Sequence, residues 1–213
     1  MELCMVKTSN MKVVVVFNHP YQGSYCNAIL QAVLAGLQKG HHEADLIHLD
    51  NDNFDPVMRA KDLEAFVQAR YDAVNACEKL DNQVLEYRQR IQQADHLVFI
   101  FPIWWELMPA LTKGFIDKVI FPGIAYDYNK RGLMKKRFVN LKGITLITTM
   151  NSASLVYRLV FGNAIKKAMF AGTFWKLGYG NRKWISLNMV KFVSPAKRAK
   201  WLYKMEKHFA KLL

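Results

Sequence analysis

Two adjacent tryptophans, Trp104 and Trp105, stand directly after an apolar run in the segment FPIWWELMPALTKGFIDKVI, residues 101–120. Core packing explains apolar side chains inside an element, but these two lie where a strand is expected to give way to a loop. Large aromatic side chains in a ligand-facing loop can stack on a planar partner. The alternative is that one of the two indoles packs under the helix that follows. The pair therefore indicates stacking or edge packing of at least one indole against a planar partner.

A second loop, NHPYQGSYCN at residues 18–27, joins an expected strand to an expected helix. The free N–H groups of a helix N-terminus favour phosphate, and His19, Ser24 and Asn27 add side-chain donors there. The loop contains neither a P-loop nor a GxGxxG motif, so ATP hydrolysis and Rossmann-type NAD binding are poorly supported. Two simpler interpretations stay open, namely that Ser24 is an ordinary N-cap and that His19 is a hydrogen-bonded structural residue.

A third loop, TTMNSAS at residues 148–154, ends another expected strand with hydroxyl and amide groups. Such groups can hydrogen-bond the polar edge of a heterocycle, although clusters of Ser, Thr and Asn are also common in ordinary loops. Metal chemistry is not indicated, because Cys4, Cys26 and Cys77 lack metal-ligand spacing and the six histidines show no HxxxH pattern. The cysteines are expected to be the reduced thiols of a cytoplasmic protein.

The elements that would position these loops alternate between strand and helix. Continuous apolar runs predict strands buried on both faces, and helical spacing of apolar residues predicts the segments between them. The expected strands are residues 12–17, 44–50, 95–101, 142–149 and 183–188, and the expected helices are 25–40, 61–74, 81–94, 109–120, about 154–177 and a last one after Ser194. Right-handed connections then give an α/β fold, a doubly wound five-stranded parallel sheet with helices on both faces. In such a sheet ligands bind outside the carboxyl ends of the strands; for a strand order of 2-1-3-4-5, the switch point lies between strands 1 and 3.

Composition limits the class of protein. The 213 residues, 52% of them hydrophobic and 22% charged, suit a single domain over residues 1–213, with residues 1–10 as an N-terminal arm. No apolar run reaches about 18 residues, and the N-terminus lacks the apolar region and cleavage site of a signal peptide. We therefore expect a cytoplasmic protein without a transmembrane segment.

Positive charge is concentrated in the second part of the chain. Residues 130–213 hold 19 Lys and Arg and one acid, Glu206, a net charge of +18, whereas residues 1–129 hold 11 basic and 16 acidic side chains, a net charge of −5. The simplest interpretation is a solvated basic face on the last helices. Peripheral contact with an anionic membrane or an acidic protein stays open. Nucleic-acid binding is not expected, since no recognition motif accompanies the charge.

Several motifs in the same order are similar to those of one known family. The chain resembles the NAD(P)H:quinone oxidoreductase family of flavodoxin-like proteins, which includes the bacterial modulator-of-drug-activity proteins. The most specific part is residues 101–120, which is similar to the family pattern FP-[IL]-x-W-x-x-x-P-A-x-[LMT]-K-G-[FW]-[IL]-[DE]-[RK]-[VI]. Further matches are HPYQGSYCNAIL, NFDPV, AYDY and LITT, so that the resemblance runs from Lys12 to about Tyr157. It implies a flavodoxin-like fold with the strand order 2-1-3-4-5.

The resemblance also implies a cofactor and the residues around it. The cofactor would be a flavin, FAD or FMN, with FAD slightly preferred. The matching positions are His19, Ser24, Tyr25 and Asn27 in the phosphate loop, Pro102, Ile103, Trp104 and Trp105 beside the isoalloxazine ring, and Thr148, Thr149, Met150 and Asn151 along its pyrimidine edge. Family members are homodimers, and Tyr126 and Tyr128 match tyrosines that the partner chain contributes to the site. Tyr157 matches a catalytic tyrosine proposed to act during hydride transfer.

The implied function is that of a flavin-dependent NAD(P)H oxidoreductase, an enzyme that passes hydride through flavin N5 to a quinone or to an azo or nitro compound. No metal is implied, and the choice between NADH and NADPH is left open. The alternative is a regulatory, ancillary subunit of a potassium-efflux system. Two departures from the mammalian members bear on the chemistry: Met150-Asn151 replaces a Gly-Gly pair, and Phe161, Gly162 and Asn163 offer no counterpart to a histidine.

Overall fold

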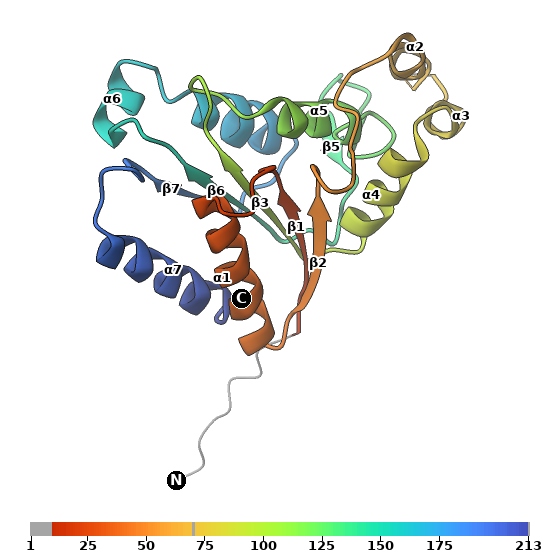
Figure 1. The fold of residues 1–213 in the computed structure, drawn as a ribbon. Helices are drawn as coiled ribbons and strands as arrows, with labels where there is room; N and C mark the ends of the chain where they lie inside the picture. Colours follow the sequence, from red (N-terminus) through yellow and green to blue (C-terminus); the bar gives the residue numbers. More distant parts are fainter. Residues whose placement is uncertain (1–9, 70, 213) are drawn as a thin grey trace.

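The structure is a computed structural model that describes residues 10–69 and 71–212, so nearly all of the expected N-terminal arm lies outside the described residues. Its centre is a five-stranded parallel sheet with the order β2-β1-β3-β6-β7 (Figure 1). The strands are β1 (Lys12–Phe17), β2 (Glu43–His48), β3 (His96–Pro102), β6 (Gly143–Thr149) and β7 (Arg182–Leu187). Since β6 and β7 are the fourth and fifth of these strands along the chain, the predicted order 2-1-3-4-5 is confirmed.

Burial follows the place of each strand in the sheet. The KVVVVF run of β1 is buried from Val13 to Phe17, and every residue of β3 and β6 is buried. A strand covered by helices on both faces has no solvent-facing side, which is why these three runs show no alternation of polar and apolar residues. The edge strands β2 and β7 are mostly half-exposed.

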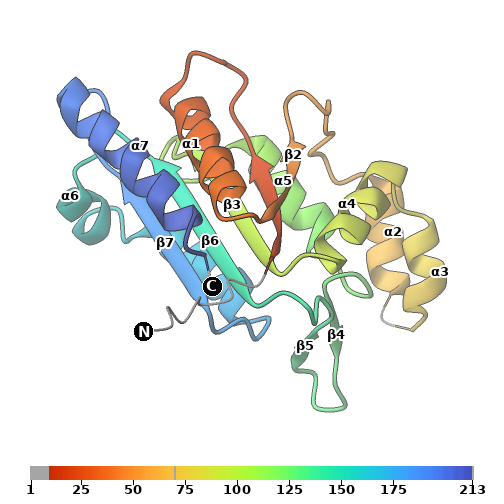
Figure 2. The same cartoon turned by 90° about the horizontal axis from the view of Figure 1, so that it is seen from below.

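Helices cover both faces of the sheet (Figure 2). α1 and α7 pack against each other on one face, and α4, α5 and η1 lie on the other. The helices are α1 (Tyr25–Lys39), α2 (Ala60–Gln68), α3 (Ala73–Glu78), α4 (Asn82–Gln92), α5 (Ala110–Val119), α6 (Ser154–Leu159), the π-helix η1 (Lys166–Trp175) and α7 (Pro195–Phe209). Within the described ranges, none of them is long and apolar enough to cross a bilayer.

On the α5 side of the sheet, two stretches differ from the elements that the sequence predicts. The expected helix at 61–74 is divided, because α2 ends at Gln68 and α3 starts anew after the N-cap Asp72. The expected loop at 121–133 contains β4 (Tyr126–Tyr128), which pairs antiparallel with β5 (Met134–Lys136). Strands of three residues are too short to show a period in the sequence, so this hairpin had no detectable signal.

The expected helix at about 154–177 is also interrupted. α6 ends at Leu159, and the chain then takes left-handed conformations at Gly162 (φ +65°) and Asn163 (φ +57°), which no α-helix contains. The following segment, η1, has π-helical hydrogen bonding, as in the 3.2 Å bond from Lys176 N–H to the carbonyl of Ala171. The helical spacing of apolar residues continues through this break. The sequence therefore predicted one helix where the structure has two, α6 and η1.

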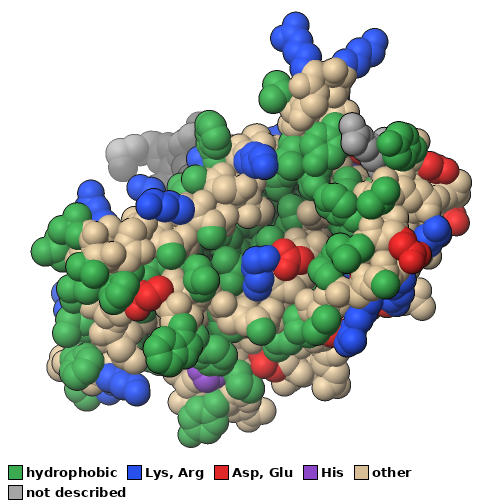
Figure 3. All heavy atoms as spheres, turned by 90° about the horizontal axis from the view of Figure 1, so that it is seen from above, with side chains coloured by type: hydrophobic (Ala, Val, Ile, Leu, Met, Phe, Trp, Pro, Cys, Tyr) green, Lys and Arg blue, Asp and Glu red, His purple; other side chains and the backbone are tan. Residues whose placement is uncertain are grey.

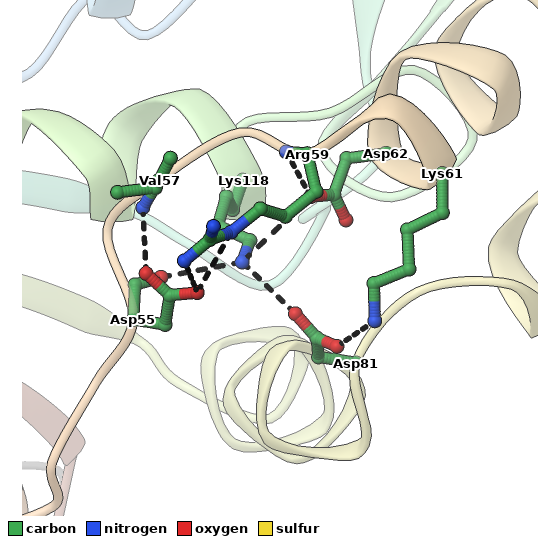
Figure 4. Close-up of polar contacts among 7 residues, drawn as sticks. All are labelled: Asp55, Val57, Arg59, Lys61, Asp62, Asp81 and Lys118. Carbon is green, nitrogen blue, oxygen red and sulfur yellow. Dashed lines mark hydrogen bonds and ion pairs between the residues drawn. The ribbon is translucent and has the colours of Figure 1, made fainter.

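The segment between β2 and α2 crosses over α5 and is tied to it by a buried lysine. The side chain of Lys118 on α5 is 2% exposed, and its ammonium lies 2.9 Å from Asp81 Oδ2 and 3.8 Å from Asp62 Oδ2 (Figure 4). It also donates to the carbonyl of Asp55 at 3.2 Å. Asp62 in turn accepts the backbone N–H of Arg59 at 2.8 Å. These contacts join α2, the start of α4 and the 55–59 segment to the helix that follows the tryptophan loop.

His96, at the start of β3, gives the fold a predicted sensitivity to acid. Its ring is 6% exposed and its Nε2 lies 2.9 Å from Thr145 Oγ1, and burial lowers its pKa from 6.5 to about 4. The folded state therefore binds fewer protons than the unfolded state between these values, and stability present above pH 6.5 is lost as the pH falls towards 4. The loss from this residue is about 3 kcal/mol, at about 1.4 kcal/mol per pKa unit.

The measurement is urea unfolding at several pH values for the wild type and for His96→Leu. The variant is expected to be less stable at pH 8, because Thr145 loses its partner, but to lose about 3 kcal/mol less than the wild type between pH 6.5 and 4. His41→Asn, at an exposed histidine with φ +57°, serves as the control and should follow the wild-type pH dependence. Parallel pH profiles for the wild type and His96→Leu would contradict this account.

Candidate functional site

The three loops expected at the site meet at the carboxyl edge of the sheet. The strands are in register so that Phe17 pairs with Ile100 and Pro102 with Thr149. The loop after β3 is bonded to the strand end beside it through Ile103 N–H, which donates to the carbonyl of Thr149 at 2.8 Å. Figure 3 views the molecule towards this edge, where hydrophobic side chains gather with Lys and Arg among them.

Both tryptophans of the second loop lie outside the core. Trp104 is 46% exposed and Trp105 is 98% exposed, so neither indole packs under α5. The loop is a tight turn in which Trp104 and Leu107 exchange backbone hydrogen bonds at 3.0 and 3.1 Å. Trp105 and Glu106 occupy left-handed conformations, with φ +48° and +64°. This conformation costs free energy in residues other than glycine and is enriched at functional sites, although His41, Asn53, Asn163 and Met189 adopt it as well.

This turn leaves backbone donors without partners. The N–H groups of Trp104 and Leu107 are bonded within the turn, whereas those of Trp105 and Glu106 donate to no group in the described part of the chain. Two adjacent free N–H groups next to two exposed indoles can bind the polar edge and the face of the same planar molecule.

The first loop ends in a well-formed helix N-terminus. Ser24 is the N-cap of α1, and its Oγ accepts the N–H of Asn27 at 3.1 Å, as the simpler interpretation predicts. Asn27 is used locally, since its side-chain amide donates to the carbonyl of Gln22 at 2.7 Å. His19 Nδ1 accepts the N–H of Tyr21 at 3.1 Å, and the His19 ring meets Trp104 edge-on at 5.9 Å between centroids. The first and second loops therefore share one surface.

The charge states at this loop follow from burial. Burial lowers the pKa of His19, and the nearby Asp50 opposes that shift, so the imidazole is mainly neutral at pH 7. Tyr25 is turned away to α7: its hydroxyl donates to the carbonyl of Arg198 at 2.9 Å, and burial raises its pKa to about 12. Cys26 is buried, and burial raises its pKa to about 11, so it is a protonated thiol rather than a nucleophile.

The third loop presents less to solvent than the sequence suggested. Thr148 is fully buried and accepts the indole N–H of Trp184 at 3.0 Å, while the hydroxyl of Thr149 lies 3.2 Å from the sulfur of Cys26. Met150 is buried as well. Asn151 is exposed, and its side chain accepts the N–H of Lys191 at 3.2 Å. Any ligand would meet mainly backbone groups here, because both threonine hydroxyls already have partners.

Tyr157 has both hydrogen-bonding functions of its hydroxyl occupied. The hydroxyl donates to the carbonyl of Glu106 at 2.9 Å and accepts the N–H of Ile165 at 3.0 Å. The residue is 2% exposed, and burial raises its pKa. In this geometry Tyr157 is bonded to the turn of residues 104–107 through the carbonyl of Glu106. Its hydroxyl proton is used in that bond and is not free for donation to a substrate. The resemblance implied a catalytic role, which this geometry does not provide.

The tyrosines expected to reach a partner chain lie on the β4–β5 hairpin. Tyr126 is 5% exposed and packs in the core of its own chain, with its ring edge-on to that of Tyr128 at 5.4 Å between centroids. Tyr128 is 47% exposed. It lines an open groove of about 910 Å³ between the hairpin and the end of α2, together with Phe66 and Tyr71. Of the two, only Tyr128 offers its ring to another molecule.

The sequence analysis did not single out two polar residues at this edge, Asn18 and Glu106. Asn18 is 2% exposed and joins three elements, because it donates to Asp50 at 2.9 Å and accepts the hydroxyl of Thr112 at the same distance. Glu106 accepts the hydroxyl of Ser152 at 3.2 Å through Oε1, whereas its Oε2 is buried without a partner. An acid between two indoles and a proline was the feature that could have drawn attention to Glu106. Among the described residues, no three His, Cys, Asp or Glu side chains are grouped as metal ligands would be.

Comparisons with known proteins match the fold over nearly the whole chain. A family model described as a flavodoxin-like fold matches residues 11–212. The NAD(P)H dehydrogenase (quinone) 1 of Cavia porcellus is 28% identical over 152 residues, which cover 68% of this chain and 55% of that protein. The first three curated relatives are matched over 55% to 64% of their own length.

Two solved structures show the same architecture. The NAD(P)H:quinone oxidoreductase from Methanothermobacter marburgensis is 22% identical with a TM-score of 0.84, and the match covers 96% of this chain and 100% of that one. An FMN-dependent NADH-azoreductase from Bacillus anthracis, crystallised in complex with FMN, is 14% identical with a TM-score of 0.75, covering 94% and 97%. At these identities the likeness concerns the fold alone.

Proposed function

The chain belongs to the flavodoxin-like family, and we propose that it is a flavin-dependent NAD(P)H oxidoreductase that reduces quinones or related acceptors such as azo and nitro compounds. The observation that carries this proposal is the strained turn at Trp104–Leu107. It holds two exposed indoles beside two unpartnered backbone N–H groups, at the sheet edge where this fold binds its ligands. The names of the quinone dehydrogenase and azoreductase relatives agree with it.

The residues at this edge fit a flavin by their chemistry. The first loop and the N-terminus of α1, a helix of 15 residues, favour an anionic phosphate. The indoles of Trp104 and Trp105 suit an aromatic ring system, and the free N–H groups of Trp105 and Glu106 suit its carbonyl and nitrogen edge. When bound, a flavin supplies the capacity to accept a hydride and to pass electrons on. The chain itself supplies binding, orientation and donors that favour negative charge on the reduced ring.

FMN is the flavin that we propose first. The slight preference for FAD drawn from the family resemblance has no support from the solved structures, since the azoreductase that shares this fold carries FMN. The contacts described above would serve either flavin, because both carry the same ring and the first phosphate. The nicotinamide donor is proposed as NADH or NADPH without a choice between them.

We assign the residues at this edge different roles in the proposed reaction. Tyr157 acts as a positioning residue, because its hydroxyl holds the carbonyl of Glu106 and so fixes the strained turn. Glu106 contributes its left-handed backbone to this turn and carries a buried carboxylate oxygen that has no hydrogen-bond partner among the described residues. In a homodimer, Tyr128 would extend over the partner's site, with Tyr126 packed behind it.

Substitution of Trp105 tests the indole wall. Trp105→Ala is expected to weaken FMN binding about tenfold, because one aromatic contact is lost. Its effect on the free energy of unfolding should stay within about 0.5 kcal/mol, since a side chain that is 98% exposed adds little to packing. The dissociation constant is measured from the change in FMN fluorescence on titration with protein.

Trp175→Ala is the matched control for this measurement. Trp175 is 65% exposed and lies at the end of η1, outside the three loops. It should leave FMN affinity unchanged, within about twofold. If both substitutions weakened FMN binding equally, the indole pair would not be part of the flavin site.

Turnover separates the proposed enzyme from the regulatory alternative. Under anaerobic conditions without an acceptor, the flavin-loaded protein should oxidise no more than one NADH or NADPH per bound flavin. It should turn over continuously once a quinone, azo dye or nitroaromatic compound is added. Flavin that binds but is not reduced by either nicotinamide under anaerobic conditions would refute the oxidoreductase and favour the ancillary subunit.

A further inference from the structure

A run of apolar side chains is exposed on α6 and the turn after it. Leu155 is 67% exposed, Leu159 69%, Val160 71% and Phe161 45%, while Tyr157 between them is buried. The helix therefore keeps one face in the molecule and turns its other face, which is also apolar, to solvent. α6 stands at the periphery of the molecule in both views of the ribbon (Figures 1 and 2).

The loop before α7 extends this surface. Phe192 is 72% exposed, and its neighbour Lys191 donates its backbone N–H to Asn151 at 3.2 Å. The same loop is bonded to the start of the α6 segment through Asn188, whose side chain donates to the carbonyl of Ser152 at 3.4 Å. We call Leu155, Leu159, Val160, Phe161 and Phe192 the α6 patch.

Three cations without an ion pair among the described residues lie next to members of the α6 patch in the structure or in the sequence. Arg158 lies within the run, and the ammonium of Lys167 lies close to the turn, since a Cβ on Gly162 would be 3.3 Å from it. Lys191 adjoins Phe192 in the sequence. In the described part of the chain none of these three forms an ion pair. Glu206 is the single acid from residue 130 to the C-terminus, and it is paired with Lys39.

We propose that the α6 patch docks on the surface of an anionic lipid bilayer. Leucine and phenylalanine side chains bury in the boundary between headgroups and acyl chains, and a rim of Lys and Arg binds acidic headgroups. Single exposed apolar residues are common on protein surfaces, but a group of them next to unpaired cations is typical of a surface that binds anionic membranes. A second copy of this chain fits less well, because a symmetric contact would place the same cations against one another.

This docking would put the candidate site beside the bilayer. α6 follows the third loop directly, and Tyr157 of α6 holds the turn of Trp105 and Glu106 through the carbonyl of Glu106. If the proposed oxidoreductase function holds, on which this one consequence rests, the acceptor is a quinone dissolved in the membrane. The docking itself is independent of any reaction.

The test is co-sedimentation of the full chain with vesicles, with no flavin or nicotinamide added. Vesicles of phosphatidylcholine containing phosphatidylserine are compared with vesicles of phosphatidylcholine alone. The protein should bind the anionic vesicles, and the partition coefficient should fall about tenfold or more in Leu159→Gln/Phe161→Gln and in Arg158→Gln/Lys167→Gln/Lys191→Gln. All five side chains are exposed, so a thermal unfolding curve close to that of the wild type is expected for both variants.

Matched controls remove exposed apolar side chains or cations from other parts of the surface. Leu133→Gln and Val139→Gln remove apolar side chains that are 62% and 73% exposed, and Lys130→Gln/Arg131→Gln/Lys135→Gln removes three exposed cations from the hairpin. These variants should keep the wild-type partition coefficient within about twofold. Equal loss in patch and control variants, equal binding to neutral vesicles, or no binding at low salt would overturn the proposal. It would also be overturned if Leu159→Gln/Phe161→Gln changed the oligomeric mass and left vesicle binding intact.

Discussion

Lys118→Met is expected to lower the free energy of unfolding by about 3–5 kcal/mol, which is the usual cost of removing one partner of a buried ion pair. Methionine keeps most of the length of the side chain, without the ammonium, and leaves Asp62, which is 1% exposed, facing a site without a cation. Asp62 Oδ1 already lacks a hydrogen-bond partner, so that carboxylate depends on the nearby ammonium. Asp81 keeps its ion pair with Lys61, so its carboxylate is still paired in the variant.

A control and a rescue make this prediction specific. Lys113→Met changes a lysine on the same helix whose pair with Asp117 is exposed, and it should cost less than about 1 kcal/mol. Adding Asp62→Asn to Lys118→Met should recover part of the loss, because the uncompensated charge is removed while an oxygen remains to accept the N–H of Arg59. Chemical denaturation of the four proteins gives these differences. Equal effects of the two lysine substitutions would show that the buried network contributes no special stability.

Gly114→Ala is expected to destabilise the protein by about 3 kcal/mol or more, although alanine is the better helix former. A Cβ on Gly114 would lie 2.3 Å from the Cα, the Cβ and the carbonyl oxygen of Pro56. Two of these atoms belong to the backbone, so no side-chain rotation can relieve the overlap. The segment that crosses α5 would have to move away, and the Lys118 contacts to Asp55 and Asp62 would be weakened with it.

The matched substitution is Gly180→Ala. A Cβ there meets no atom within 4 Å, and the residue does not have a left-handed conformation. Its effect on the free energy of unfolding should stay within about 0.5 kcal/mol. If Gly114→Ala unfolds with the same midpoint as the wild type, the close crossing of Pro56 over α5 is not present in solution. A variant that is too unstable to purify fulfils the prediction, provided that Gly180→Ala is purified normally.

These two effects bear on the site because α5 follows directly from the tryptophan turn. Pro109 is the N-cap of α5, two residues after Leu107 closes the turn. The close packing of Gly114 on Pro56 and the contacts of Lys118 hold α5 in place, and α5 in turn fixes the position of the chain at the end of the turn. The motif K-G-[FW] of the family resemblance therefore has a packing reason, since only glycine permits the chain to cross so closely at this place.

Much of the architecture could be predicted from local signals. The β-branched run at 12–17 and the apolar runs that became β3 and β6 indicated central strands, and Ser24 and Ser194 were identifiable as helix N-caps. The hairpin and the interruption after α6 could not be predicted. Three-residue strands have no detectable period, and the left-handed pair at Gly162–Asn163 depends on a backbone conformation that apolar spacing does not report.

The meeting of the three loops at one edge could be predicted, but the contacts of their side chains could not. Strand order alone brought the three loops to one edge, and the exposed indoles lie there. What sequence could not reveal was which side chains already have partners, because the partners come from distant segments: Thr148 meets Trp184, and Tyr25 meets Arg198. Likewise, the sequence does not reveal that the hydroxyl of Tyr157 is bonded to both Glu106 and Ile165.

The central claim is that the edge formed by the loops after β1, β3 and β6 binds a flavin. The most direct measurement is to mix the purified chain with excess FMN or FAD, remove the free flavin, record the visible spectrum and identify by mass what denaturation releases. The account predicts a yellow protein that releases FMN in proportion to the chain, and a Trp105→Ala protein that retains less of it. A colourless protein that retains neither FMN nor FAD would contradict it.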